Sequence, residues 1–142
     1  ANNYCDWGIP LGRRFRALKL WFVIRSYGIK GLQDKIRNQI GLAKELHDIL
    51  LNEKDFEILA PMIANVICFR YKPENVNDED VLNILNEKLM HTLNSTGKIY
   101  LSHTKLAGRY TLRLVIAQTN VEKRHVNNAF ELIKTYSKLI KY

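Results

Sequence analysis

The sequence has few of the residues that mark metal-binding, disulfide-rich or membrane-spanning proteins. Only two cysteines, Cys5 and Cys68, occur among its 142 residues, and they lie far apart. Close-spaced cysteines are typical of zinc sites and of small secreted domains, so the sequence indicates neither. Its longest apolar run, residues 20–24, is far shorter than the roughly 20 residues of a membrane-spanning helix. We therefore expect a cytoplasmic protein with reduced thiols.

Several motifs of known active sites are also absent. The sequence has no GxGxxG or GxxxxGK[ST] phosphate loop, no GxSxG nucleophile turn and no HExxH zinc motif. Its four histidines are scattered, so we expect no metal site. The opening residues, ANNYCDW, lack the hydrophobic segment of a signal peptide.

The charge balance is basic, with 22 Lys and Arg against 14 Asp and Glu, a formal net charge of +8. Such an excess permits binding to nucleic acid or to an acidic partner. Half of it lies in residues 1–28, and the rest is spread thinly. A nucleic-acid module more often carries a continuous basic stripe with exposed aromatic residues.

Hydrophobic periodicity predicts an α+β fold. Apolar residues at three- and four-residue spacing predict helices at about 12–27, 30–51, 78–96 and 122–140. Runs rich in β-branched and aromatic residues predict strands at 56–60, 65–71, 98–106 and 110–118. This order predicts a small, mainly antiparallel four-stranded sheet with helices packed on one face.

Small and polar residues predict where several elements begin or end. Gly28 is the expected cap after the first helix, and Ala107-Gly108 the expected turn of a hairpin. We expect Asn77 or Asp78 to cap the third helix and Thr119 or Asn120 to cap the fourth. We place the domain boundary near Gly28, between residues 1–28 and an α+β body at residues 29–142.

The most informative segment is WGIPLGRRFRALKLWFVIRSYG, residues 7–28. It joins Arg13, Arg14 and Arg16 to a dense apolar block. A helix that is apolar on most faces is typical of a buried element. Arginines near its start oppose the helix dipole unless anions meet them. We therefore expect this segment to form half of an interface.

Arg113 is a second candidate because it stands between two leucines of the last expected strand. A buried arginine needs an anionic partner. The alternatives are contact with a carboxylate or phosphate, a structural ion pair, or a surface side chain that reaches solvent.

Residues 9–28 closely resemble a segment of the group II, pyridoxal-phosphate-dependent decarboxylases of fold type I, the aromatic-amino-acid decarboxylases. The resemblance extends over about residues 7–133, and its later pieces keep the order of the family. Gly8 departs from it, since many relatives carry glutamine there. The later pieces are FEI at 56–58, VICFR at 66–70, NSTGK at 94–98, YTLRL at 110–114 and EKRHV at 122–126.

The resemblance implies the C-terminal portion of a carboxy-lyase that acts on aromatic L-amino acids: one large-domain helix followed by the small domain. The family binds pyridoxal 5′-phosphate through a lysine that follows a histidine, and this sequence contains no His-Lys pair. We therefore expect residues outside this chain to bind most of the cofactor. We also expect no catalytic residue in the chain and no activity of the segment alone. Because the chain starts with Ala, we expect Ala1 to mark a cut or a chain break.

The resemblance also implies roles for the segment at residues 7–28. Leu11 and Gly12 are expected to reach the active site of the neighbouring subunit in a homodimer. Glycine at position 12 is implied to leave room for a bulky ring, whereas several relatives that act on histidine or tyrosine carry serine. Arg13, Arg14 and Arg16 are expected to form ion pairs between subunits or domains.

The implied partners are the remaining N-terminal part of the enzyme, a second copy and an aromatic substrate, with neither nucleic acid nor membrane. Two alternatives stay open. One is a free-standing basic α+β module that binds nucleic acid or an acidic partner. The other is an aromatic aldehyde synthase, which shares the fold and oxidises as it decarboxylates.

Overall fold

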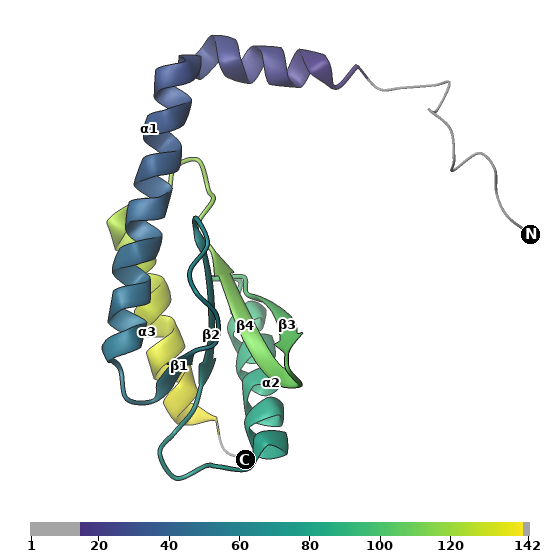
Figure 1. Cartoon of the computed structure of the whole chain (residues 1–142), viewed down its shortest axis with the longest axis vertical. Helices are drawn as coiled ribbons and strands as arrows, with labels where there is room; N and C mark the ends of the chain where they lie inside the picture. The colour runs from purple at the N-terminus through teal and green to yellow at the C-terminus, as the bar shows by residue number, and fades with distance from the viewer. Residues whose placement is uncertain (1–14, 141–142) are drawn as a thin grey trace, which may run out of the picture. The chain divides into compact units, whose positions relative to one another are not determined.

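The computed structural model describes residues 15–140, which form three helices and four strands (Figure 1). The order confirms the α+β prediction, with the first two expected helices joined as α1. The elements are α1 (Ala17–Asn52), β1 (Phe56–Ile58), β2 (Val66–Tyr71), α2 (Glu79–Ser95), β3 (Ser102–Leu106), β4 (Arg109–Val115) and α3 (Lys123–Leu139).

α1 consists of two helical segments that are separated by a kink at Gly28. This residue has φ 66° and ψ 171°, in the region of positive φ that favours glycine. The break lies where the sequence predicts a glycine cap. Two compact units nevertheless divide between Ile36 and Arg37, so the kink lies inside the first unit. The helix begins at Ala17, and the expected start at Gly12 lies outside the described residues.

The four strands form one antiparallel sheet in the order β1-β2-β4-β3. The β3–β4 hairpin turns at Ala107 and Gly108, whose φ angles are 50° and 81°. Positive φ at both central residues of a two-residue loop matches the strand twist and is typical of a type I′ turn. The predicted turn is therefore confirmed, although alanine pays a steric cost there that glycine avoids.

One face of the sheet packs against α2, α3 and the part of α1 after Ile36. Along β2, alternate side chains enter this core, while Cys68 and Arg70 occupy the intervening positions. The prediction of helices on one face is confirmed. The fully buried core residues include Ala43, Leu46, Leu50, Ile67, Phe69, Leu89, Leu93, Leu112 and Ile133.

Asparagine side chains of α2 bind backbone groups at the ends of the sheet. Asn86 accepts a hydrogen bond from the Tyr71 N–H at 2.7 Å and donates to its carbonyl at 2.8 Å. Asn94 binds the N–H and carbonyl of Leu101 at the same two distances. A carboxamide presents one donor and one acceptor group, as a peptide unit does. Each asparagine therefore pairs backbone groups as a neighbouring strand would.

Asn83 makes the third such connection, to the hairpin. Its side-chain oxygen accepts from the Tyr110 N–H at 2.6 Å, and its nitrogen donates to the Gly108 carbonyl at 3.2 Å. The β2–β4 ladder ends at Phe69 and Leu112. Asn83 and Asn86 thus bind backbone groups beyond that end, and they attach α2 to both strands.

Several boundaries differ from the predictions. β1 ends at Ile58 rather than at residue 60, and β4 ends at Val115 rather than at residue 118. Two other differences have a local cause. β3 begins at Ser102 rather than at residue 98, because the backbone groups of Leu101 are bonded to Asn94. α3 is capped by Glu122 rather than by Thr119 or Asn120. The Glu122 N–H donates to Nδ1 of His125 at 3.0 Å. For α2, the predicted cap Asp78 is confirmed.

We expect Asn86→Ala to lower the free energy of unfolding by about 2–4 kcal/mol, because it removes the side-chain partner of two buried backbone groups. Asn128→Ala, an exposed change on α3, is the control and should cost less than about 0.5 kcal/mol. Urea denaturation at neutral pH measures both. Equal midpoints for the two variants would show that the Asn86 bonds contribute little to stability.

Candidate functional site

The residues predicted to shape the substrate pocket, Leu11 and Gly12, lie outside the described residues, as do Arg13 and Arg14. Arg16 is described; it lies exposed just before α1, and its carbonyl accepts a hydrogen bond from the Lys19 N–H at 3.1 Å. The pocket and ion-pair roles of these residues stay predictions.

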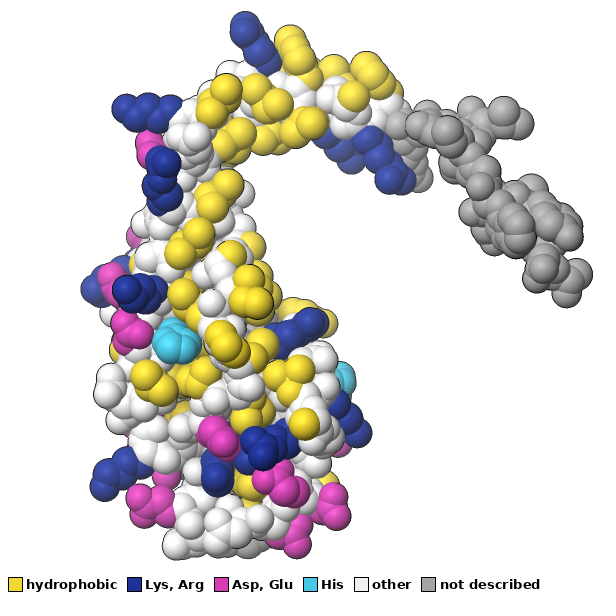
Figure 2. All heavy atoms as spheres, viewed as in Figure 1, with side chains coloured by type: hydrophobic (Ala, Val, Ile, Leu, Met, Phe, Trp, Pro, Cys, Tyr) yellow, Lys and Arg dark blue, Asp and Glu magenta, His cyan; other side chains and the backbone are white. Residues whose placement is uncertain are grey.

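The segment of α1 before Gly28 exposes a large apolar surface (Figure 2). Trp21 and Phe22 touch edge to face with ring centres 5.1 Å apart, and the Arg25 guanidinium lies 5.8 Å from the Trp21 ring centre. Soluble helices normally confine apolar residues to one stripe, and wider apolar surfaces mark interfaces. The exposed apolar residues of this segment are Leu18, Leu20, Trp21, Phe22, Val23, Ile24 and Tyr27.

β2 carries a buried arginine within a cluster of charges. Arg70 is 1% exposed, and its guanidinium donates to Glu57 at 2.8 Å and to both oxygens of Glu79, at 2.6 and 3.2 Å. Lys72 and Arg109 lie 3.8 and 3.9 Å from the Glu57 carboxylate. The cluster joins β1, β2, α2 and the β3–β4 hairpin.

The ion pairs hold Arg70 and Glu79 in their charged forms. Hydrogen bonding from Arg70 is the main cause that lowers the pKa of Glu79, and the charges of Arg109 and Lys72 add to it. Burial is the largest effect on Arg70 and acts to lower its pKa. The bonds and charges of Glu79 and Glu57 together outweigh burial and raise that pKa. The cluster is therefore a fixed ion-pair network, unsuited to proton transfer at neutral pH.

The sequence analysis singled out Arg113 and missed the role of Arg70. Arg113 is exposed and donates from Nε to Oγ of Ser102 at 3.3 Å. No salt bridge between it and a carboxylate occurs in the part of the chain that the structure describes. The signal for Arg70 is Glu57, its cross-strand partner in β1, but that pairing emerges only from the register.

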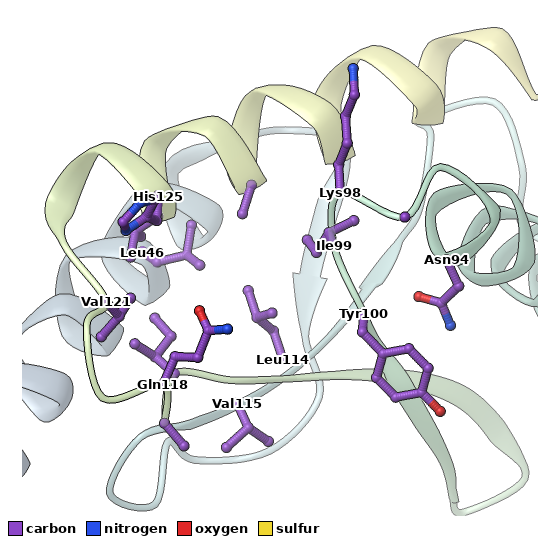
Figure 3. Close-up of a pocket in the computed structure, with 15 residues that line it drawn as sticks. Leu46, Asn94, Lys98, Ile99, Tyr100, Leu114, Val115, Gln118, Val121 and His125 are labelled. Atoms are coloured by element: carbon purple, nitrogen blue, oxygen red, sulfur yellow. The ribbon is translucent and has the colours of Figure 1, made fainter.

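A cavity of about 510 Å³ opens where β4 ends, beside the start of α3 (Figure 3). Leu46 and Leu114 line its apolar part, and the Gln118 carboxamide reaches toward its centre from the connection between β4 and α3. His125 also lines it, but Nδ1 of that imidazole already accepts from the Glu122 N–H. None of the lining residues is acidic.

The described residues do not fit a site for pyridoxal phosphate or for a metal. No lysine follows a histidine in the sequence. Within residues 15–140, Arg70 is the one fully buried charged side chain, and its guanidinium is already paired with two carboxylates. Over the same residues, no three His, Cys, Asp or Glu side chains are placed to bind a metal ion. No helix among them has the length and apolarity to cross a membrane.

The family described as "Pyridoxal-dependent decarboxylase conserved domain" matches residues 1–72, just over half of the chain. The chain belongs to this family. It is 45% identical over 132 residues to tryptophan decarboxylase TDC1 of Camptotheca acuminata, covering 93% of this chain and 26% of that protein. It is 44% identical over 138 residues to tyrosine decarboxylase 4 of Petroselinum crispum, covering 95% of this chain and 27% of that protein.

The fold is also that of the family. The crystal structure of Oryza sativa TDC with PLP and tryptamine matches 94% of this chain with a TM-score of 0.85 and 37% identity. The match covers 29% of that chain. The present chain thus spans about a quarter of the length of the relatives that it matches.

Because of the Arg70 cluster, we expect the stability of the fold to be sensitive to acid. The pKa of the Glu79 carboxyl is lower in the folded than in the unfolded state. The ionised carboxyl therefore stabilises the folded state fully above about pH 4.3, the ordinary value of a glutamate carboxyl. The stabilisation is lost as pH falls through the folded-state pKa. We expect Glu79→Gln to be less stable than the parent at neutral pH and to lose less stability on acidification.

Thermal unfolding at a series of pH values measures this difference. Glu87→Gln, an exposed change on the same helix, is the control and should follow the parent curve. Parallel curves for Glu79→Gln and the parent would contradict a stabilising role for the Glu79 charge.

Proposed function

We propose that the chain is the C-terminal segment of a pyridoxal-phosphate-dependent carboxy-lyase that acts on aromatic L-amino acids. Membership of the decarboxylase family supports this proposal most directly. The tryptophan and tyrosine decarboxylases named above match nearly the whole chain, which favours a large aromatic substrate. The likeness to a solved plant enzyme with PLP and tryptamine supports the same cofactor and the same class of substrate.

In this proposal the segment shapes the enzyme, and the cofactor is bound by residues outside the chain. Leu11 and Gly12 contribute to the substrate pocket, and Arg13, Arg14 and Arg16 form ion pairs across a homodimer or domain interface. The exposed apolar surface of α1 before Gly28 supports an interface at this position, because burying it would remove a large apolar area from water. Cys68 is a free thiol, which fits a cytoplasmic enzyme.

The full-length protein provides the test. We expect it to show the absorbance band of bound pyridoxal phosphate at roughly 400 nm. We also expect it to release carbon dioxide and the corresponding amine from L-tryptophan, L-tyrosine or L-dopa. Release of the aldehyde in place of the amine would assign an aldehyde synthase. A protein without the band that binds RNA in a salt-sensitive way would overturn the proposal.

Gly12→Ser tests the proposed substrate pocket. The added hydroxymethyl group takes up space and offers a hydrogen bond, so we expect selectivity to move toward smaller or phenolic rings. Roughly a tenfold change in the ratio of kcat/KM values for tryptophan and tyrosine is the expected scale. Gly41→Ser is the matched control, because no atom lies within 4 Å of a Cβ added there. An unchanged ratio in Gly12→Ser would remove Gly12 from the pocket.

A further inference from the structure

We propose that His125 makes the start of α3 sensitive to pH. While its imidazole is neutral, Nδ1 accepts a hydrogen bond from the Glu122 N–H at 3.0 Å and holds the first turn of the helix. When the imidazole takes up a proton, this bond is lost and the first turn is released. The inference is independent of the proposed function, because every contact that it uses lies in the compact unit after Ile36.

The bond determines which ring nitrogen of His125 carries the hydrogen. A backbone N–H can only donate, so Nδ1 must present a lone pair to it. In the neutral imidazole the hydrogen is therefore on Nε2, whereas in the imidazolium both nitrogens carry one. The side chain is exposed, so water can deliver the proton. Protonation thus turns the acceptor of this bond into a donor.

His125 occupies a position that other helices give to a residue with a fixed acceptor. The first N–H groups of a helix have no partner within it, and a Glu or Gln at the third helical position commonly bonds to the N–H of the cap residue. In α3 the cap residue is Glu122, and the third position is His125. A glutamine accepts at any pH, whereas histidine ordinarily gains its charge between about pH 5 and 8. The residue type therefore makes this cap dependent on pH.

The groups around His125 give the imidazolium no way to keep the bond. The Glu122 carboxylate attracts a positive charge, but a turn of the ring toward it would also take Nδ1 away from the Glu122 N–H. That carboxylate already accepts from Nε of Arg124 at 2.8 Å. The charged and titratable groups near His125 on its own helix, on α1 and on the cavity wall are Glu122, Lys123, Arg124, Glu45, Lys98 and Tyr100.

The other three histidines have different surroundings. Nδ1 of His47 lies 3.2 Å from the Asp48 carboxylate, so protonation would strengthen that contact. The His103 ring stacks on Tyr110 with ring centres 4.7 Å apart, and His91 is exposed on α2. Among the hydrogen bonds of the described residues, only that of His125 joins a histidine ring to a backbone N–H. Proton uptake by His125 therefore has a consequence that is specific to α3.

Release of the first turn also changes one wall of the cavity. His125 and Val121 lie at the same side of it (Figure 3). Within the turn, the Val126 N–H reaches the Glu122 carbonyl only at 3.4 Å. Before the turn, the Gln118 carbonyl accepts from the Gln39 carboxamide at 3.3 Å. These bonds are long, so the bond from the Glu122 N–H to His125 is a main restraint on this wall.

Hydrogen exchange of the full-length protein, resolved to single amides, tests the proposal without a mutation. Each rate is divided into the rate of an unstructured chain at the same pH, which removes the intrinsic effect of pH. We expect the protection of the Glu122 N–H to fall roughly fivefold between about pH 7.5 and 5.5, as one hydrogen bond is lost. The Leu89 N–H in the middle of α2 is the internal control and should keep its protection. Unchanged protection of the Glu122 N–H would overturn the proposal.

The Glu122 carboxylate does not titrate in this pH range and so cannot produce the same effect. Hydrogen bonding from Arg124 is the main cause that lowers its pKa, and the charge of Arg124 adds to it. The carboxylate therefore stays ionised at both pH values.

His125→Gln separates the imidazole from every other titrating group. The glutamine carboxamide has an acceptor oxygen at both pH values, so we expect the Glu122 N–H to stay protected at about pH 5.5. His91→Gln, the same exchange on the exposed face of α2, is the matched control and should retain the loss seen in the parent. A loss in His125→Gln equal to that of the parent would assign the effect to another group and overturn the proposal.

His125→Ala measures what the bond contributes at neutral pH. It removes the acceptor from an exposed position, so the fold should persist while the Glu122 N–H exchanges roughly fivefold faster at both pH values. Protection equal to that of the parent at about pH 7.5 would show that the bond does not hold the first turn, and would also overturn the proposal.

Discussion

The fold depends on pairing backbone groups where the small sheet ends. β2 and β4 stop pairing at Phe69 and Leu112, and α2 supplies the bonds beyond that point through asparagine side chains. An unpaired buried N–H or carbonyl is costly, so the helix is attached to the sheet by specific polar bonds as well as by apolar packing. This attachment holds the strand ends and the loop before β3 in place. At the opposite end of the sheet, Asn94 binds the backbone of Leu101 and also lines the cavity.

Charge is distributed in two contrasting ways in the described chain. Inside, Arg70 is matched by Glu57 and Glu79, so the buried cation is neutralised within the domain. Outside, Arg113 is exposed, and no salt bridge joins it to a carboxylate among the described residues. This contrast fits the proposal that the chain is one segment of a larger enzyme.

Local sequence signals predicted most elements, because they act through neighbouring residues. Period-3.6 and β-rich patterns located the helices and strands, and Gly28, Asp78 and Ala107-Gly108 were each found where their backbone geometry requires them. The failures involve side-chain bonds that hydrophobic patterns do not show. The start of β3 depends on Asn94, and the role of Arg70 depends on the strand register. The roles predicted for Leu11 and Gly12 rest on resemblance to a family and stay predictions, since no local pattern in the sequence would indicate a pocket shared between subunits.

The asparagines of α2 also set a limit on how this protein can change with time. Exchange of asparagine for aspartate replaces a single nitrogen with oxygen and preserves the shape of the side chain. The carboxylate could still accept from a backbone N–H, but it would face the Tyr71 or Leu101 carbonyl with no proton to share. Hydrolytic loss of ammonia makes the same exchange in stored or heated protein. Deamidation of Asn86 or Asn94 would therefore weaken the attachment of α2 to the sheet. Substitution of either residue by aspartate is disfavoured for the same reason.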